Sequence, residues 1–204
     1  SSDTDDDDNS SQLLLAVAAR NAKEVERLLQ VKDIDVNVRD EDGCTPLHYA
    51  CKSESGIVEQ LLRNKDIKVN LLTTNGLTAL YVACEYGVDS NVKQLVKAAD
   101  IDVNKTQSEN GVTPLMAACD RGAKNAQRKC IEILLGAPGI DVNQPLTSGA
   151  TALYIACKNK QRLEAVHLLL ESHTVPYIKI NKAKTNGKTP LFLACAKGNS
   201  GAVK

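Results

Sequence analysis

The chain has 204 residues and a mass of 21.9 kDa, which suits one or two globular domains or one extended array. Hydrophobic residues make up 43% of it and charged residues 25%, so a core can form and disorder throughout the chain is excluded. Aromatic residues are only 3%, which argues against a nucleic-acid reader that stacks bases on aromatic rings, and no apolar run is long enough to span a bilayer.

The net charge of zero hides an acidic half and a basic half. Residues 1–104 contain 11 Lys/Arg and 19 Asp/Glu, a net charge of −8, whereas residues 105–204 contain 14 Lys/Arg and 6 Asp/Glu, a net charge of +8. Five of the acids, Asp3 and Asp5 to Asp8, lie in a stretch that has no apolar residue before Leu13. Because it has nothing to bury, the stretch over residues 1–11 is predicted to be a disordered acidic tail.

One five-residue phrase occurs five times along the chain. It reads Gly-x-Thr-Pro-Leu or Gly-x-Thr-Ala-Leu, over residues 43–47, 76–80, 111–115, 149–153 and 187–191. An Ala-Cys pair follows each copy, with its Cys at Cys51, Cys84, Cys119, Cys157 and Cys195. Successive cysteines of this set are 33, 35, 38 and 38 residues apart. A segment that ends in Val-Asn or Ile-Asn precedes each copy. A period in this range is typical of stacked supersecondary units.

Each unit is predicted to contain two short helices. The Thr of each phrase is an N-cap candidate, and Pro or Ala follows it at the first helical position. The first helix then carries the Leu and the Ala-Cys pair on one face. In the second helix apolar residues recur at i, i+3 and i+4, as in Val58, Leu61 and Leu62. The Val-Asn segment and the next Gly predict an extended turn that leads into the following unit.

This ordered set of motifs resembles the ankyrin repeat family over residues 12–204. The resemblance implies an all-α solenoid of about six stacked helix-turn-helix units joined by β-turn or hairpin loops. The units span approximately residues 12–41, 42–74, 75–109, 110–147, 148–185 and 186–204. The first unit lacks the Gly-x-Thr phrase, as expected of an end cap. The sixth stops before any Leu pair, so we expect the natural chain to continue.

Two units are longer than the others. The fourth has extra residues within residues 120–129, and the fifth is stretched between Leu170 and Ile178, a segment that includes Pro176. We expect both to form longer loops that leave the stack intact, because added loop length costs little free energy.

The sequence offers no pattern for catalysis or metal binding. It has no CxxC motif, and no Cys/His cluster has the spacing of a zinc site. Packed helices lie about 8–10 Å apart, too far for disulfides between the five Cys at one register, so we interpret these as small buried residues in a reducing compartment. Cys44 lies beside a turn and is an alternative exposed thiol. His48 occupies the place at which ankyrin repeats have a structural His that hydrogen-bonds the backbone. We predict no enzyme activity and no cofactor.

The resemblance also implies a protein partner that binds the hairpin tips and the concave side formed by the first helices. Positions there are free of the core pattern and vary between units, which suits a recognition surface. The predicted contact residues are Glu41, Asp42, Lys52, Asn75, Leu77, Glu85, Tyr86, Asn110, Val112, Asp120, Arg121, Lys158, Lys188 and Lys197. A further register either anchors a partner or fills gaps between units, and comprises His48, Tyr81, Met116, Tyr154 and Phe192.

The charge asymmetry predicts an acidic protein segment as a partner of the basic half, near Arg121, Lys158, Lys188 and Lys197. The Asp-rich tail of another copy is one candidate for this segment. Because surface ion pairs are weak individually, such contacts are expected to act more on the rate of encounter than on affinity.

The functional hypothesis is a non-catalytic protein-protein interaction module, a scaffold or adaptor of the cytoplasm or nucleus. The alternative is the recognition arm of a larger enzyme or signalling protein, such as a kinase, a ubiquitin ligase or a secreted effector. Nucleic-acid binding is disfavoured because a basic groove motif and interleaved aromatic residues are missing. No membrane contact is predicted.

Overall fold

The computed structural model describes residues 2–106, 110–120, 125–158, 160–172 and 177–203. The chain divides into two compact units, Ser1–Ile101 and Asp102–Lys204, called unit 1 and unit 2 below. Every regular element among the described residues is a helix, which confirms the predicted all-α class.

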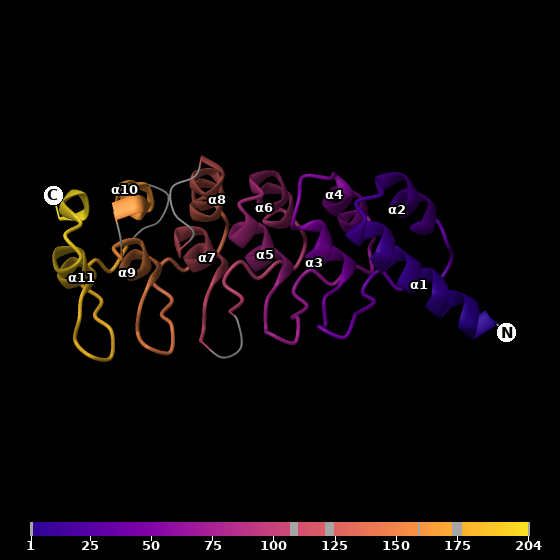
Figure 1. Cartoon of the computed structure of the whole chain (residues 1–204), viewed down its shortest axis with the longest axis horizontal. Coiled ribbons are helices and arrows are strands. Elements are labelled where there is room, and N and C mark those ends of the chain that lie inside the picture. Colours follow the sequence, from indigo (N-terminus) through magenta and orange to yellow (C-terminus); the bar gives the residue numbers. More distant parts are fainter. Residues whose placement is uncertain (1, 107–109, 121–124, 159, 173–176, 204) are drawn as a thin grey trace. The chain divides into compact units, whose positions relative to one another are not determined.

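Unit 1 is a stack of three helical hairpins. Helix α1 (Ser2–Ala18) packs against α2 (Ala22–Leu28), α3 (Pro46–Ala50) against α4 (Ile57–Leu62), and α5 (Ala79–Tyr86) against α6 (Asp89–Leu95). The first helices of the hairpins, here called inner helices, contact one another in the order α1, α3, α5, and the second or outer helices in the order α2, α4, α6 (Figure 1).

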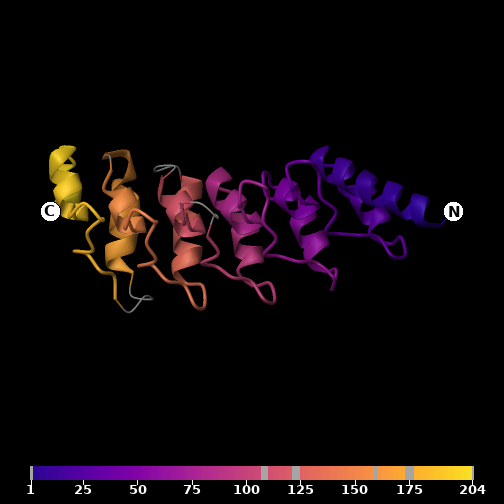
Figure 2. The ribbon, with the colours of Figure 1, turned by 90° about the horizontal axis from the view of Figure 1, so that it is seen from below.

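Unit 2 continues the same plan. Helix α7 (Pro114–Asp120) packs against α8 (Asn125–Leu135), and α9 (Ala152–Ala156) packs against α10 (Leu163–Glu171), which follows the short 3₁₀ helix η1 (Lys160–Arg162). Helix α11 (Pro190–Ala196) packs against α9 and against a second 3₁₀ helix, η2 (Ser200–Ala202). The inner helices α7, α9 and α11 form one row, and long loops leave that row before α9 and α11 (Figures 1 and 2).

Threonine caps start the inner helices as the sequence predicts. The hydroxyl oxygen accepts a hydrogen bond from the backbone N–H three residues on: Thr78 from Tyr81 (3.0 Å), Thr113 from Met116 (3.2 Å), Thr151 from Tyr154 (3.4 Å) and Thr189 from Phe192 (3.1 Å). These bonds satisfy one of the N–H groups that a helix start leaves without an intrahelical partner.

Replacing Thr78 with alanine is expected to lower the free energy of unfolding by about 1 kcal/mol, since the part-buried hydrogen bond from the Tyr81 N–H to the Thr78 hydroxyl is lost. Urea unfolding followed by circular dichroism measures this change. Thr78→Ser keeps the hydroxyl and serves as the control. An alanine variant as stable as the serine variant would show that the cap contributes nothing.

The core includes apolar residues of both rows of helices, such as Leu47 and Leu80 of the inner helices. The outer helices contribute predicted apolar residues that are each at most 2% exposed: Val25 and Leu28, Val58 and Leu61, Val92 and Leu95, Ile131 and Leu134, and Val166 and Leu169. Cys51, Cys84, Cys119 and Cys157 are buried as predicted. Burial raises the pKa of the Cys119 thiol to about 12 and that of the Cys157 thiol to about 11, so both stay protonated. All seven cysteines are described, and all are free thiols.

The predicted burial of Cys195 was wrong. Cys195 is exposed, because α11 is the last α-helix of the described residues and no further inner helix stands over it. Helix α1 begins at Ser2 and includes the acidic stretch that the sequence predicts to be a disordered tail. Ser10 is buried, and its hydroxyl accepts the Asp35 N–H at 3.0 Å.

The insertion of the fourth repeat also differs from its prediction. Helix α8 has 11 residues, whereas α4 has 6 and α6 has 7, so part of the insertion lengthens the outer helix instead of a loop. Residues 121–124 and 173–176 lie outside the described residues, and with them the longer loop expected around Pro176.

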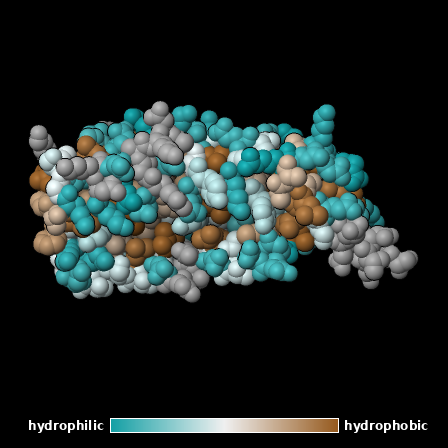
Figure 3. Space-filling view, in the orientation of Figure 1, coloured by the Kyte–Doolittle hydropathy of each residue, from teal (hydrophilic) through white to brown (hydrophobic). Residues whose placement is uncertain are grey.

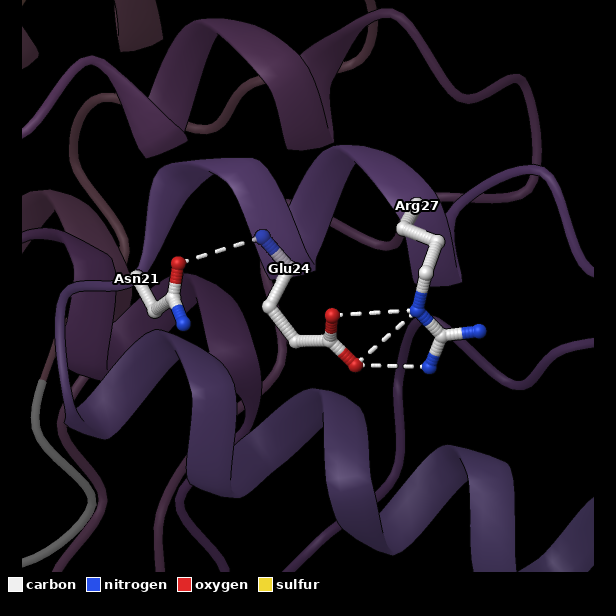
Figure 4. Close-up of polar contacts among 3 residues, drawn as sticks. All are labelled: Asn21, Glu24 and Arg27. Atoms are coloured by element: carbon white, nitrogen blue, oxygen red, sulfur yellow. Dashed lines mark hydrogen bonds and ion pairs between the residues drawn. The ribbon is translucent and has the colours of Figure 1, made fainter.

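Helix α2 shows how an outer helix begins in the first repeat. The Asn21 side chain accepts the Glu24 N–H at 3.2 Å, and the Glu24 carboxylate pairs with Arg27 one turn later, with a closest approach of 2.6 Å (Figure 4). Because the ion pair is exposed, its contribution to stability is small, and the cap fixes the helix start.

Candidate protein interaction surface

A tight turn precedes the inner helices α3, α5, α9 and α11, where the sequence places the Gly-x-Thr phrase. In unit 1 the Asp40 N–H donates to the Cys44 carbonyl at 3.1 Å, and the Gly43 N–H donates back to the Asp40 carbonyl at 2.9 Å. The same pair of bonds forms over residues 73–77, 146–150 and 184–188. These turns are the hairpin tips of the predicted recognition surface.

Neighbouring tips are bonded directly to each other. The Thr74 N–H donates to the Asp42 carbonyl at 2.8 Å, and in unit 2 the Thr185 N–H donates to the Ser148 carbonyl at 3.0 Å. Gly43 has φ +70°, and a Cβ at this position would lie 2.9 Å from the Thr74 nitrogen. Glycine is therefore required at residue 43 both by the backbone conformation and by the approach of the next tip.

The Asn of the Val-Asn segment joins successive repeats at the base of the tips. The Asn37 amide donates to the Asp66 carbonyl and accepts the Lys68 N–H, both at 2.8 Å. In unit 2 the Asn143 amide donates to the Tyr177 carbonyl at 2.6 Å and accepts a backbone N–H at 2.7 Å. Each Asn side chain therefore both donates to and accepts from the backbone of the next repeat. These bonds set the spacing between neighbouring tips within a unit.

The predicted contact residues of unit 1 lie on the tips and inner helices. Glu41, Asp42, Asn75 and Tyr86 are exposed, Tyr86 at 54% of its surface. Half-buried positions are occupied by Lys52, Leu77, Tyr81 and Glu85.

The predicted contact residues of unit 2 follow the same arrangement. Asn110, Asp120, Lys158, Lys188, Phe192 and Lys197 are exposed, and Val112 and Tyr154 are half-buried. Arg121 lies outside the described residues.

Met116 does not belong to this surface. It is 1% exposed, which for this residue favours the second of the two predicted roles, filling a gap between repeats, over contact with a partner. Its flexible, unbranched side chain packs in the core. Phe192, at the equivalent position of α11, is instead 52% exposed. The register of large inner-helix side chains is thus partly core and partly surface.

His48 has the structural role that its motif predicts. It is 1% exposed, and its Nδ1 accepts the Thr45 N–H at 3.1 Å, which leaves Nε2–H to donate to the Leu77 carbonyl at 3.0 Å. The ring therefore links one inner helix start to the turn of the next repeat. Burial lowers the pKa of His48, so the ring is neutral near pH 7.

Tyr49 was missed by sequence reasoning. Its hydroxyl donates to Asp40 Oδ2 at 2.7 Å, and Lys52 Nζ lies 4.3 Å from the ring centroid. The hydrogen bond to the Asp40 carboxylate, together with burial, raises the pKa of Tyr49 to about 12. The only signal is its place next to His48 on α3, one residue outside the register considered above.

A family model described as ankyrin repeats (3 copies) matches residues 1–73, 53–145 and 122–204. The chain belongs to the ankyrin repeat family. Ankyrin repeats generally mediate protein-protein interaction and are typically non-enzymatic. No curated protein matches this ankyrin repeat chain.

Solved structures share this ankyrin fold over 94% of the chain. The ankyrin repeat protein EF0377 has a TM-score of 0.82 at 24% identity, with 94% of that chain covered. A structure of the Bd0816 predatory endopeptidase from Bdellovibrio bacteriovorus in complex with immunity protein Bd3460 gives a TM-score of 0.71 at 25% identity, also with 94% covered. The human ASB11 ankyrin repeat domain gives 0.72 at 27% identity, with 80% covered.

The hollows of the ankyrin repeats are open grooves. One of about 260 Å³ is lined by Glu26, Gln60 and Arg63, and one in unit 2 of about 220 Å³ is apolar and lined by residues such as Leu170 and Leu191. Neither brings a nucleophile together with a general base. Among the described residues, no group of three or more His, Cys, Asp or Glu side chains could hold a metal ion. No helix of the described chain is both long and apolar enough to cross a membrane.

Proposed function

We propose that this chain is a non-catalytic interaction module that binds a partner protein through its hairpin tips and the neighbouring inner-helix side chains. The observation that carries the proposal is that the backbone of the tips is held in place while the side chains of the tips are exposed. The turn backbone is held by bonds between repeats, as between Thr74 and Asp42, while side chains such as Glu41 and Tyr86 stay exposed. Such a preorganised surface loses little conformational entropy when a partner binds.

Two further facts support this proposal. Ankyrin repeats generally mediate protein-protein interaction, and one of the structural relatives above was solved as a complex of two proteins. We place the module in a reducing compartment, the cytoplasm or nucleus, because its buried thiols are unpaired.

The test compares two double variants of equal charge change in a capture experiment. Glu41→Arg with Tyr86→Ala alters a tip and an inner helix, whereas Glu26→Arg with Leu29→Ala alters the outer helix α2 and the residue that follows it. Partners cross-linked to the wild-type chain in a lysate are identified by mass spectrometry, and circular dichroism confirms that both variants fold.

We expect the tip variant to lose the main partner and the outer-helix variant to retain it. Equal retention by both variants, or loss with the outer-helix variant alone, would place the binding surface elsewhere and overturn the proposal.

A further inference from the structure

The C-terminal part of unit 2 carries positive charge without any negative charge. Between Tyr177 and Val203 the sequence has no Asp or Glu, and it has five lysines, at positions 179, 182, 184, 188 and 197. None of the ion pairs between described residues involves these lysines. In Figure 1 this segment comprises the yellow loop below α11 together with α11 itself, and Figure 3 shows hydrophilic side chains at the lower left, where that loop lies.

Two of these lysines flank the same turn. The Lys184 N–H donates to the Lys188 carbonyl at 2.9 Å, and the Gly187 N–H donates to the Lys184 carbonyl at 2.9 Å, with Gly187 at φ +77°. The turn therefore fixes the two lysine backbones opposite each other and lets their side chains diverge.

The diverging side chains reach two successive inner helices. Lys184 Nζ lies 5.5 Å from the ring centroid of Tyr154 on α9, and Lys188 Nζ lies 5.5 Å from that of Phe192 on α11. The two rings occupy equivalent places, three residues after the capping Thr of each helix. At this range the rings attract the ammonium groups, which narrows the conformations of two otherwise flexible side chains.

Two more lysines lie at the other end of the same helices. Lys158 follows α9 and Lys197 follows α11, and both are exposed. Lys158 is four residues beyond Tyr154, about one helical turn or 6 Å along the axis. Lys158 and Lys197 therefore lie beyond the C-terminal ends of the two helices whose first turns carry the aromatic rings, and of these rings Phe192 is 52% exposed.

We propose that this lysine-aromatic surface, made of Tyr154, Lys158, Lys184, Lys188, Phe192 and Lys197, binds an acidic peptide segment of a partner protein. Carboxylates of the segment pair with the ammonium groups, and an apolar side chain packs on the exposed part of Phe192. The inference rests on the proposed function and names the chemistry of the partner. Each exposed ion pair contributes little, but several carboxylates that pair at once with the four lysines, two of which lie over aromatic rings, act together.

The same surface suits nucleic acid less well. Base recognition without sequence preference depends on stacking against open aromatic faces. Here an ammonium group lies over each of the two rings, and the surface contains no Arg to stack in their place. An extended acidic peptide needs neither feature.

The experiment measures fluorescence anisotropy of a labelled peptide of glutamates with one central leucine. Two other ligands are compared with this peptide: the same peptide with glutamine in place of glutamate, and a single-stranded DNA with the net charge of the glutamate peptide. The variants are Lys184→Glu with Lys188→Glu and, as a matched control of equal charge change, Lys93→Glu with Lys97→Glu on exposed positions of unit 1. Circular dichroism confirms that each variant folds.

We expect the glutamate peptide to bind, and to bind more weakly as salt is raised. The Lys184/Lys188 variant should lose at least about tenfold in affinity, equivalent to about 1.4 kcal/mol, with little change in the control. Phe192→Ala should lose affinity for the peptide with leucine but not for one with serine in its place.

Other outcomes overturn the inference. Equal losses in both charge variants would show a general effect of net charge, and tighter, equally variant-sensitive binding of DNA would make this a nucleic-acid site. Salt-sensitive self-association that the Lys184/Lys188 variant abolishes would make the occupant a second copy of this chain. If the peptide fails to bind at all, the acidic partner is excluded, and the proposed function is still decided separately by the Glu41 and Tyr86 variants.

Discussion

Replacing Asn91 with leucine is expected to lower the free energy of unfolding by about 2 kcal/mol. Asn91 lies on α6 and is 2% exposed, and its amide donates to the Ser53 carbonyl at 3.0 Å and to the Ala50 carbonyl at 3.3 Å. Both acceptors lie at or just beyond the end of α3, in the preceding repeat. The variant removes the donor and leaves these carbonyls without the bonds that a helix end needs.

The shape of leucine is not the cause of this loss. Ile57 occupies the equivalent place of the preceding outer helix and is fully buried, so an apolar side chain of this size fits the position. Ser90→Ala, at the half-buried neighbouring position, is the control and should change the free energy by less than about 0.5 kcal/mol. Guanidinium unfolding of both variants measures the difference. Stability equal to or above wild type would mean that apolar burial compensates fully for the lost bonds.

The sequence predicts the framework because the framework is set locally. Each Thr cap contacts an N–H only three residues away, and the apolar pairs of the outer helices follow the helical period. Repetition strengthens these local signals, since the same pattern returns five times. The hairpins, the turns and the buried Cys at the shared register up to Cys157 all follow from it.

The structure differs from the sequence-based prediction where the burial of a residue depends on a neighbouring repeat. Asn91 lies outside the apolar pattern of its helix and is still buried, because its partners Ala50 and Ser53 lie about forty positions earlier. Cys195 matches Cys157 in sequence, but among the described residues no inner helix follows α11 to cover it. Neither difference can be read from the residues of a single repeat.

The sequence predicts which residues of the candidate site are on the surface, but not which of them contact each other. Lys188 and Phe192 were both expected on the surface, but their pairing at 5.5 Å depends on the turn that also carries Lys184. Lys184 itself was not predicted, because it lies three residues before Gly187, whereas the predicted tip positions begin two residues before the glycine, as at Glu41.

Lowering the pH from about 6.5 is expected to destabilise the protein through His48, by up to about 1.4 kcal/mol per pH unit. Burial lowers the pKa of this ring below its ordinary value, and the charges of Arg39 and Lys52 act in the same direction, while its bond to the Leu77 carbonyl opposes them. In the unfolded chain the ring titrates near its ordinary pKa. Between the two pKa values the unfolded state binds more protons, so the free energy of unfolding falls as pH falls.

The variant His48→Gln tests this assignment. A Gln at the third helical position can still accept the Thr45 N–H, so the start of α3 is retained while the titrating group is removed. The unfolding free energy of the variant should fall less steeply than that of wild type below pH 6.5 and should show no such difference above it. His167→Gln, at an exposed position on α10, is the control and should keep the wild-type pH profile. Parallel profiles of wild type and His48→Gln would refute the role of His48, because protonation at Nδ1 must break the Thr45 bond that the neutral ring accepts.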